Sequence, residues 1–264
     1  MHHHSPVRVA TWNVNSLKAR LGRVEAWLAE CEPDVLCLQE TKLADSAFPA
    51  LAFQSLGYDS VHHGEGRWNG VAILSRVGVE APASGFAPDD AIMGNEARIL
   101  SATCGGVRVA SVYVPNGRSL DDPQYAYKLE WLRRLRTHLV AACDRSADIL
   151  VCGDFNIAPT DLDVWDASAV HGATHVSEPE RDALADLESW GLVDVFRRHH
   201  DEAGLYSWWD YRAGHFHKHF GMRIDLVLAS ASLAERSQWA LIDRNARKGQ
   251  QPSDHAPLVV DFAL

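Results

Sequence analysis

The pattern of apolar and polar positions along the chain predicts a series of short β-strands. In some segments the two kinds of residue alternate, and in others the apolar run is nearly continuous, as in a strand buried on both faces. Gly105-Gly106 separates two of these segments and is a two-residue signal for a hairpin turn. The predicted strands are residues 7–15, 34–39, 71–75, 99–104, 107–114, 149–153, 223–229, 238–243 and 258–262.

Helical spacing of apolar residues predicts helices between these strands, at residues 19–31, 123–143 and 179–190. The middle helix is expected to turn a stripe inward that consists of Tyr125, Leu129, Leu132, Leu135 and Leu139. The predicted strands lie on both sides of the predicted helices in the sequence, and hairpins recur. This order predicts an α/β protein in which two packed mixed sheets are flanked by helices.

Composition narrows the class of protein. Apolar residues make up 47% of the 264 positions and charged residues 23%, near the globular average, which excludes a disordered or fibrous chain. No apolar run approaches the ~18 residues that a membrane helix needs. The formal charge of −10 argues against a protein that coats nucleic acid by bulk electrostatics. Basic residues within 205–225 and 244–255 still favour a local basic rim.

The five cysteines are odd in number, form no Cys-x-x-Cys pair and have mostly apolar neighbours. Buried free thiols in a reducing compartment are therefore expected, and with them a cytoplasmic protein. Residues 1–6 contain three histidines and lack the apolar core of a signal peptide. We interpret them as a tag remnant, and residues 7–264 as a single domain.

Acidic and amide side chains follow several of the predicted strands. Strand ends are where loops converge on a rigid sheet, so these side chains are expected to meet. Their oxygens are ligands that suit Mg²⁺ or Mn²⁺, and clustered carboxylates would repel one another without a cation. The residues are Asn13, Glu40, Asp154, Asn156, Asp225 and Asp254.

His255 follows Asp254 directly and supplies a group that can share a proton. A pairing with Asp225 would set its pKa near or above neutrality. With a metal ion to neutralise phosphate oxygens and a carboxylate to take a proton from water, this set suits attack by water on a phosphodiester. Whether one or two ions act, and which group is the base, stays open.

Each of these residues alone has an ordinary alternative. An Asp-x-Asn sequence after a strand is common in turns, and a strand-end glutamate is often solvated. Asp225 can be the ion-pair partner of Arg223, and Asp254-His255 can cap the last strand. The hypothesis therefore depends on their occurring together in a fixed order.

Seven segments carry a resemblance to a known family. They are residues 11–15 (TWNVN), 38–42 (LQETK), 68–73 (WNGVAI), 113–117 (YVPNG), 153–156 (GDFN), 223–225 (RID) and 253–257 (SDHAP). In this order they resemble the exonuclease III family of abasic-site endonucleases, within the endonuclease/exonuclease/phosphatase superfamily, over residues 7–262. The resemblance implies a four-layer α/β sandwich of the DNase I-like type.

The resemblance also implies roles for residues of this chain. The metal site, expected to take Mg²⁺ with Mn²⁺ as a substitute, would be formed by Glu40, Asn13, Asp254, Asp154 and Asn156. Asp154 would orient or deprotonate the attacking water. His255, held by Asp225, would contact the scissile phosphate. The catalytic set is then Tyr113, Asn116, Asp154, Asn156, Asp225 and His255.

Duplex DNA with abasic sites or 3′ ends is the partner that the resemblance implies, bound by a monomer. Contacts with DNA are expected from Lys42, Trp68, Asn69, Arg118 and Arg212, although each can be an ordinary surface residue. Arg212 can bind phosphate but is poorly suited to intercalation. A pocket for a flipped-out baseless sugar would be lined by Trp208, Met222 and Ile224, since extruding a sugar without a base costs least. The alternative is that these three belong to the core.

The function that these features favour is a Mg²⁺-dependent DNA-repair nuclease. It would hydrolyse the phosphodiester 5′ to an abasic site and would also act as a 3′→5′ exonuclease and clean blocked 3′ ends. One alternative is a lipid or inositol phosphoesterase of the same superfamily. Another is a catalytically silent DNA-binding protein. The alternating His215, His217 and His219 have no further Cys or His to complete a transition-metal site, and a solvated loop is expected there.

Overall fold

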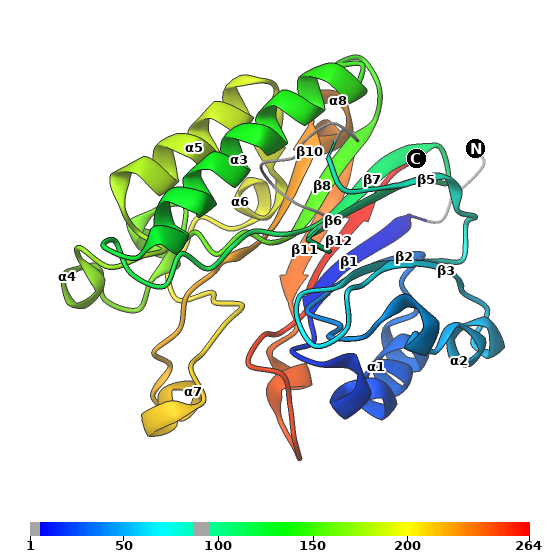
Figure 1. Ribbon diagram of the computed structural model, residues 1–264, viewed down its shortest axis with the longest axis horizontal. Helices are drawn as coiled ribbons and strands as arrows, with labels where there is room; N and C mark the ends of the chain where they lie inside the picture. The colour runs from blue at the N-terminus through cyan, green and yellow to red at the C-terminus, as the bar shows by residue number, and fades with distance from the viewer. Residues whose placement is uncertain (1–5, 87–95) are drawn as a thin grey trace.

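The computed structural model describes residues 6–86 and 96–264, and these form two six-stranded sheets packed face to face (Figure 1). The first sheet has the order β11 (Ser237–Ile242), β12 (Leu258–Phe262), β1 (Val7–Asn13), β2 (Val35–Gln39), β4 (Val71–Ser75), β3 (Asp59–His63). The second has the order β5 (Glu80–Ser84), β6 (Ile99–Cys104), β7 (Val107–Tyr113), β8 (Ile149–Asp154), β10 (Asp225–Ser230), β9 (Leu192–Asp194).

Helices cover the outer face of each sheet. In Figure 1, α1 and α2 lie against the first sheet, and α3 and α5 lie side by side on the second. Apolar clusters between helices and sheets hold each layer, which gives the four-layer sandwich predicted from the sequence. The helices are α1 (Leu17–Cys31), α2 (Ala50–Ser55), α3 (Pro123–Ala142), α4 (Ala167–Val170), α5 (Glu178–Ser189), α6 (Val195–His199), α7 (His215–Lys218) and α8 (Ala231–Glu235).

The centres of the two sheets share one arrangement. In the first sheet β1 and β2 pair in parallel and are joined by α1, and in the second β7 and β8 pair in parallel and are joined by α3. The other strand pairs are antiparallel, including the predicted hairpin of β6 and β7. A helical crossover is the usual way to join parallel neighbours.

The two sheets pack through alternate residues of their strands. Because side chains alternate between faces, one face of each strand points into this interface. Its main part is apolar and includes Val9, Cys37, Leu100, Cys152 and Val227. Hydrophobic burial here joins strands that lie far apart in the sequence.

Toward one end the same interface becomes polar. Thr11 and Gln39 hydrogen-bond to each other, and Gln39 Nε2 also donates to Ser111 Oγ at 3.1 Å. All three side chains are buried, and each lies two residues along its strand from an apolar member of the interface. The next inward positions at this end carry the predicted site residues.

Several strand and helix predictions are confirmed, and others are corrected. The strand expected at 223–229 begins at Asp225, because Arg223 turns its side chain to Asp163 and Asp194 instead of entering the sheet. In α3 the inward stripe contains Lys128 and Trp131, whereas Leu129 is only half-buried. Strands β3, β5 and β9 were not predicted: β3 is mostly polar, β5 is exposed, and β9 has only three residues.

The five cysteines are free thiols, as expected from the sequence. Residues 1–5 of the expected tag remnant lie outside the described residues. Among the helices of the described ranges, none combines the length and the apolar content needed to cross a membrane.

Gly153 allows the close approach of β7 and β8 just before Asp154. Its φ is 151°, and a Cβ atom there would lie 1.9 Å from the carbonyl oxygen of Val112. That overlap is with backbone, which cannot move aside without breaking the strand pairing. The position therefore requires glycine.

We expect Gly153→Ala to lower the free energy of unfolding by about 3 kcal/mol and Tm by roughly 6–12 °C. Thermal unfolding followed by circular dichroism measures this. Gly22→Ala in α1 is the matched control, because a Cβ there meets nothing within 4 Å. The control should be neutral or stabilising by up to ~1 kcal/mol. An unchanged Tm for Gly153→Ala would contradict the analysis.

Candidate active site

Three neighbouring strands of the second sheet place polar side chains in one row. In the register of β7, β8 and β10, Tyr113 lies opposite Asp154, and Asp154 lies opposite Asp225. All three continue the alternation of inward-facing positions, past the apolar part of the interface. Strand pairing therefore brings into one row residues that lie far apart in the sequence.

Asn13, at the end of β1, joins this row to the first sheet. Its Nδ2 donates to Glu40 Oε1 and to Asp154 Oδ2, at 2.9 Å each. Its Oδ1 accepts from the backbone N–H of Asn15 at 3.0 Å. In this geometry Asn13 orients two carboxylates through its amide hydrogens, so the carboxylates are the better placed metal ligands.

His255 lies between two carboxylates of the second sheet. Its Nδ1 is 2.8 Å from Asp225 Oδ2, and its Nε2 is 3.7 Å from Asp154 Oδ2. The ring is buried, and the backbone carbonyl of His255 accepts from the indole N–H of Trp12 at 3.1 Å. The alternative pairing of Asp225 with Arg223 is wrong, because Arg223 pairs with Asp163 and Asp194.

Burial and crowding perturb the titration of this cluster. The pKa of Asp154 is raised to about 7, mainly by burial and also by the charges of Asp225 and Glu40, while His255 and the hydrogen bond from Asn13 oppose the rise. Burial disfavours the charged ring of His255, but the carboxylates of Asp225 and Asp154 outweigh it and raise its pKa to about 10. The imidazole is thus held protonated beside a carboxylate that can take up a proton near neutral pH.

A divalent cation fits this donor set. Asp154, Asp225 and His255 offer atoms within 4.8 Å of one another, and the buried Asp225 Oδ1 has no hydrogen-bond partner among the described residues. Since His255 is protonated, carboxylate oxygens are the ligands available to an ion. Oxygen ligands select a hard cation, and its charge would relieve the repulsion that raises the pKa of Asp154.

Asp254 belongs to the same site through a chain of hydrogen bonds. Its carboxylate accepts from Trp208 Nε1 at 3.1 Å and from Asn15 Nδ2 at 3.0 Å. Lys42 Nζ donates to Asn15 Oδ1 at 2.6 Å and forms an ion pair with Glu40 at 2.9 Å. Glu40 and Asp254 are therefore linked on one side of the site.

Backbone conformation marks the site as well. Glu40, Lys42 and Asn156 have φ values of 50°, 53° and 51°, in the left-handed region that residues other than glycine seldom adopt. Asparagine tolerates this region, but glutamate and lysine do so at a cost. Strain of this kind persists where surrounding contacts enforce it, and it is concentrated at functional sites.

Asn116 and Asn156 face each other beside the row of strand residues. Asn116 Nδ2 donates to Asn156 Oδ1 at 3.1 Å, and Asn156 Nδ2 donates to the carbonyl of Val114 at 3.0 Å. The backbone N–H of Asn156 donates to Asp154 Oδ1 at 2.9 Å. The structure thus brings all six residues predicted as catalytic to one end of the sandwich.

The predicted sugar pocket is an apolar cluster next to His255. Met222 and Ile224 are buried in it and Trp208 is half-buried, together with Ala158 and Val164. Trp208 forms isolated β-bridges with both Met222 and His255. The cluster adjoins the acids, and its use as a pocket stays a prediction.

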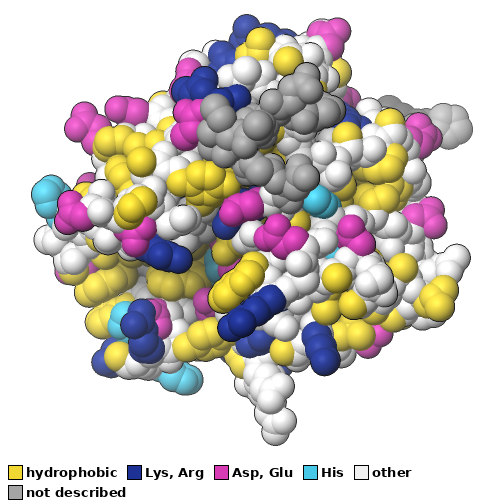
Figure 2. Space-filling view, viewed as in Figure 1, with side chains coloured by type: hydrophobic (Ala, Val, Ile, Leu, Met, Phe, Trp, Pro, Cys, Tyr) yellow, Lys and Arg dark blue, Asp and Glu magenta, His cyan; other side chains and the backbone are white. Residues whose placement is uncertain are grey.

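The residues predicted to contact DNA differ in exposure. Trp68 is 61% exposed, and the side chains of Arg118 and Arg212 are 70% and 87% exposed. Lys42 and Asn69 are engaged within the protein, Lys42 with Glu40 and Asn69 with Glu65. Figure 2 shows Lys and Arg side chains, with Asp and Glu among them, around a hollow on this face, and the basic rim stays a prediction.

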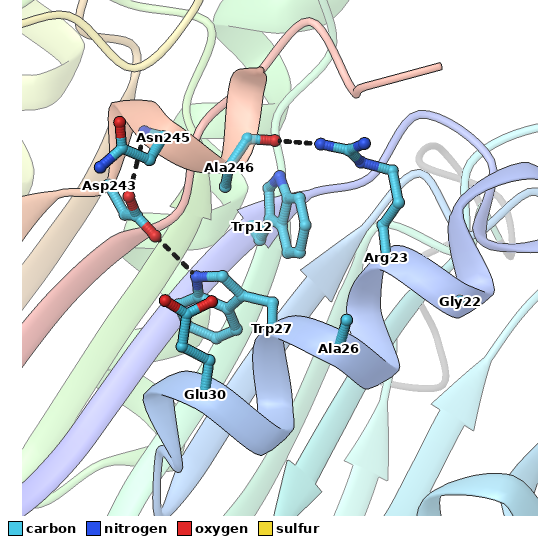
Figure 3. Close-up of a pocket in the computed structure, with 9 residues that line it drawn as sticks. All are labelled: Trp12, Gly22, Arg23, Ala26, Trp27, Glu30, Asp243, Asn245 and Ala246. Atoms are coloured by element: carbon cyan, nitrogen blue, oxygen red, sulfur yellow. Dashed lines mark hydrogen bonds between the residues drawn. The ribbon is translucent and has the colours of Figure 1, made fainter. Parts of the chain in front are cut away.

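A separate cleft of about 340 Å³ lies between α1 and the turn that follows β11. Figure 3 shows its lining, in which Trp27 Nε1 donates to Asp243 and Arg23 donates to the carbonyl of Ala246. Trp12 lines the cleft and also donates to the backbone carbonyl of His255, but none of the active-site acids lines the cleft.

His175 is a site residue that the sequence analysis missed, since no neighbouring motif points to it. Its Nδ1–H donates to the carbonyl of Asn156 at 2.5 Å, and its ring centroid is 6.4 Å from that of Trp208. Burial lowers the pKa of His175 to about 4, and the charge of Lys128 adds to this effect. The ring is therefore neutral at neutral pH.

The family follows from comparison with known proteins. Residues 10–255 match the model of the Endonuclease/Exonuclease/phosphatase family, and the chain belongs to that family. It is 34% identical to exodeoxyribonuclease III of Haemophilus influenzae, over 97% of this chain and 100% of that protein.

Solved structures agree in fold. An AP endonuclease from Archaeoglobus fulgidus superposes with a TM-score of 0.94 at 37% identity, covering 98% of this chain and 100% of the other. The 3′-5′ exonuclease NExo from Neisseria meningitidis superposes with a TM-score of 0.93 at 39% identity, covering 97% and 100%. The resemblance and fold predicted from the sequence are therefore confirmed.

His175 should make the fold less stable in mild acid. Its pKa is lower when folded than the usual value of ~6.5, so the unfolded chain binds an extra proton between these values. Its contribution is complete above pH 6.5 and falls by up to ~1.4 kcal/mol per pH unit as the pH drops toward 4. Urea unfolding at pH 7.5, 6 and 5 measures the slope.

His175→Asn keeps a donor for the carbonyl of Asn156 but does not titrate. The variant should lower the slope of unfolding free energy against pH by ~1.4 kcal/mol per pH unit, which corresponds to one proton. The difference between the two unfolding series measures this change. Parallel slopes for the variant and the wild type would mean that His175 is protonated in the folded state.

Proposed function

We propose that this protein is a DNA-repair nuclease that hydrolyses the phosphodiester 5′ to an abasic site in duplex DNA. The same centre would also remove nucleotides from 3′ ends and clean blocked 3′ ends. The observation that carries the proposal is the meeting of Glu40, Asp154, Asp225 and His255 at the polar end of the sandwich. Relatives named as exodeoxyribonuclease III, AP endonuclease and 3′-5′ exonuclease support it.

The residues of the chain divide the chemistry among them. Asp154, oriented by the hydrogen bond from Asn13, accepts the proton of the attacking water. The imidazolium of His255 and the amides of Asn116 and Asn156 donate to the phosphate oxygens. Burial raises the pKa of Tyr113 well above its usual value, so this side chain stays a neutral phenol and adds a further donor.

We propose Mg²⁺ as the resident ion, with Mn²⁺ as a substitute, held by Glu40 and Asp154. Such an ion, when bound, neutralises phosphate charge and stabilises the charge that develops during displacement. Asn13 fixes the two carboxylates relative to each other, and the Lys42 ammonium limits the negative charge of Glu40. Asp254 and Asn156 would complete the surroundings of the ion.

The balance between activities is the finer part of the proposal. The relatives include an AP endonuclease and the 3′ phosphatase NExo from Neisseria, which was solved with a product DNA hairpin. We propose that abasic sites enter through the cluster of Trp208, Met222 and Ile224, and that Trp68, Asn69, Arg118 and Arg212 contact the duplex. The enzyme would act as a monomer in the cytoplasm, at the bacterial nucleoid.

A cleavage assay tests the proposal against its alternatives. The substrates are a duplex with one abasic analogue, the same duplex intact, a duplex with a 3′ phosphate, and an inositol phosphate, each with and without EDTA. Incision 5′ to the abasic analogue that EDTA abolishes is the expected result. Preference for the inositol phosphate would favour the lipid or inositol phosphoesterase, and DNA binding without any cleavage would favour the silent binder.

Glu40→Gln should weaken use of the metal. The amide keeps the shape and one oxygen but loses the charge that attracts the ion, so the Mg²⁺ concentration for half-maximal activity should rise about 10-fold or more. High Mg²⁺ should restore part of the rate. A magnesium titration of the cleavage rate measures this, and wild-type activity at low Mg²⁺ would contradict the role given to Glu40.

Asp154→Asn should abolish cleavage, by about 10³-fold or more, because an amide cannot accept the proton of water. The amide preserves the shape of the side chain and keeps one acceptor oxygen for Asn13 or Asn156, so binding of abasic DNA should be retained. Fluorescence anisotropy measures binding beside the cleavage assay. Equal loss of binding and cleavage would mean that Asp154 has a structural role.

A further inference from the structure

Lys128 is a fully buried lysine on the inward face of α3, between the leucines and tryptophan that pack this helix on the second sheet. An ammonium group in such surroundings is costly unless its donors are all used. Burial accordingly lowers the pKa of Lys128, although Glu180 opposes the shift. Neither sequence periodicity nor the catalytic roles above account for this residue.

The ammonium of Lys128 joins the two loops that carry Asn116 and Asn156. Its Nζ donates to the backbone carbonyl of Asn156 at 2.7 Å and to that of Asn116 at 3.3 Å. The third partner is the carboxylate of Glu180, on α5, which is equally buried. The ammonium thus uses each of its donors, and two of the acceptors lie on the loops after β7 and β8.

Glu180 extends the same network to a third loop. Its carboxylate accepts from Thr174 Oγ1 at 2.8 Å, from the His175 N–H at 3.0 Å and from Ser177 Oγ at 2.6 Å. Thr174 and His175 in turn contact the carbonyls of Asn116 and Asn156, at 3.2 Å and 2.5 Å. Both carbonyls are therefore held from two directions.

The packing leaves little room for these loops to shift. A Cβ atom on Gly117, next to Asn116, would lie 3.0 Å from Thr174 Oγ1 and 3.1 Å from Lys128 Cδ. The loop after β7 therefore rests directly on the lysine stem. A buried ion pair is by itself weak evidence for stability, because hydrophobic side chains of similar volume often do as well. What the pair provides here is a fixed position for two backbone carbonyls.

We propose that Lys128 and Glu180 are positioning residues that hold the Asn116 and Asn156 side chains at the phosphate. The inference deepens the proposed function and rests on it, since the two asparagines are the groups assigned to the phosphate. Neither Lys128 nor Glu180 touches the substrate. A misplacement of a catalytic group by about 1 Å can lower the rate ~10²-fold. The gain in rate from holding the main-chain carbonyls of the two asparagines can therefore outweigh the cost of burying a charge pair.

The test compares three variants of the full chain loaded with Mg²⁺. Lys128→Met removes the ammonium with little change of volume. The double variant Lys128→Met/Glu180→Gln also removes the carboxylate charge that the first change leaves unpaired. Arg136→Met is the matched control, because Arg136 also links α3 to Asp186 of α5 but lies outside the network of the three loops.

We expect Lys128→Met to lower kcat about 10- to 100-fold, with KM changed by less than about threefold, and to lower Tm. The double variant should regain much of the lost Tm, since no unpaired charge stays buried, but not the lost kcat. The Ala158 amide, which donates to the carbonyl of His175 at 2.8 Å, should exchange with deuterium faster in both. Arg136→Met should keep the wild-type kcat and exchange rates.

Two results would overturn the proposal. One is wild-type kcat and wild-type exchange of the loop amides in Lys128→Met. The other is recovery of kcat together with Tm in the double variant, which would reduce the pair to a structural role. If the wild-type protein cleaves no DNA, the proposed function fails instead, and the exchange of the Ala158 amide still decides whether Lys128 holds the loops.

Discussion

The alternation of side chains along paired strands is the constraint on which the whole structure depends. It sends every second residue of β1, β2, β7, β8 and β10 into the space between the sheets. Apolar residues fill most of that space, and Thr11, Gln39 and Ser111 begin its polar end. The same register that builds the core therefore aims Asn13, Tyr113, Asp154 and Asp225 at one another, without any special loop geometry.

Much of this was predictable, because local pattern and motif order carried it. Apolar runs located the central strands, and strand-end acids located the site. The prediction failed at residues whose place in the fold depends on partners that are distant in the sequence. Lys128 occupies a helical position that periodicity reserves for an apolar residue, and its partners lie in other loops. His175 stands in no motif, and Arg223 leaves its predicted strand for Asp163, which only the folded chain brings near.

Electrostatics unite the site and its supports. Burial raises the pKa of Asp154, and the attraction of Asp225 and Asp154 raises the pKa of His255 against the effect of its burial, so the cluster holds protons that a phosphodiester hydrolase must move. Behind it the Lys128–Glu180 pair holds the loops, and the charge of Lys128 also helps to keep the His175 ring neutral. The protein thus separates the charges that act on substrate from those that hold loops in place.

The path of the chain between the sheets has a consequence for timing. The strands β5 to β10 form the second sheet, and the chain then returns to complete the first sheet with β11 and β12. His255 follows Asp154 and Asp225 in the sequence and precedes β12, which pairs with β1. A growing polypeptide therefore holds every acid of the site, Asp254 included, before it gains the imidazole. The segment that carries His255 is therefore fixed by the last strand of the chain, through the pairing of β12 with β1 at the centre of the first sheet.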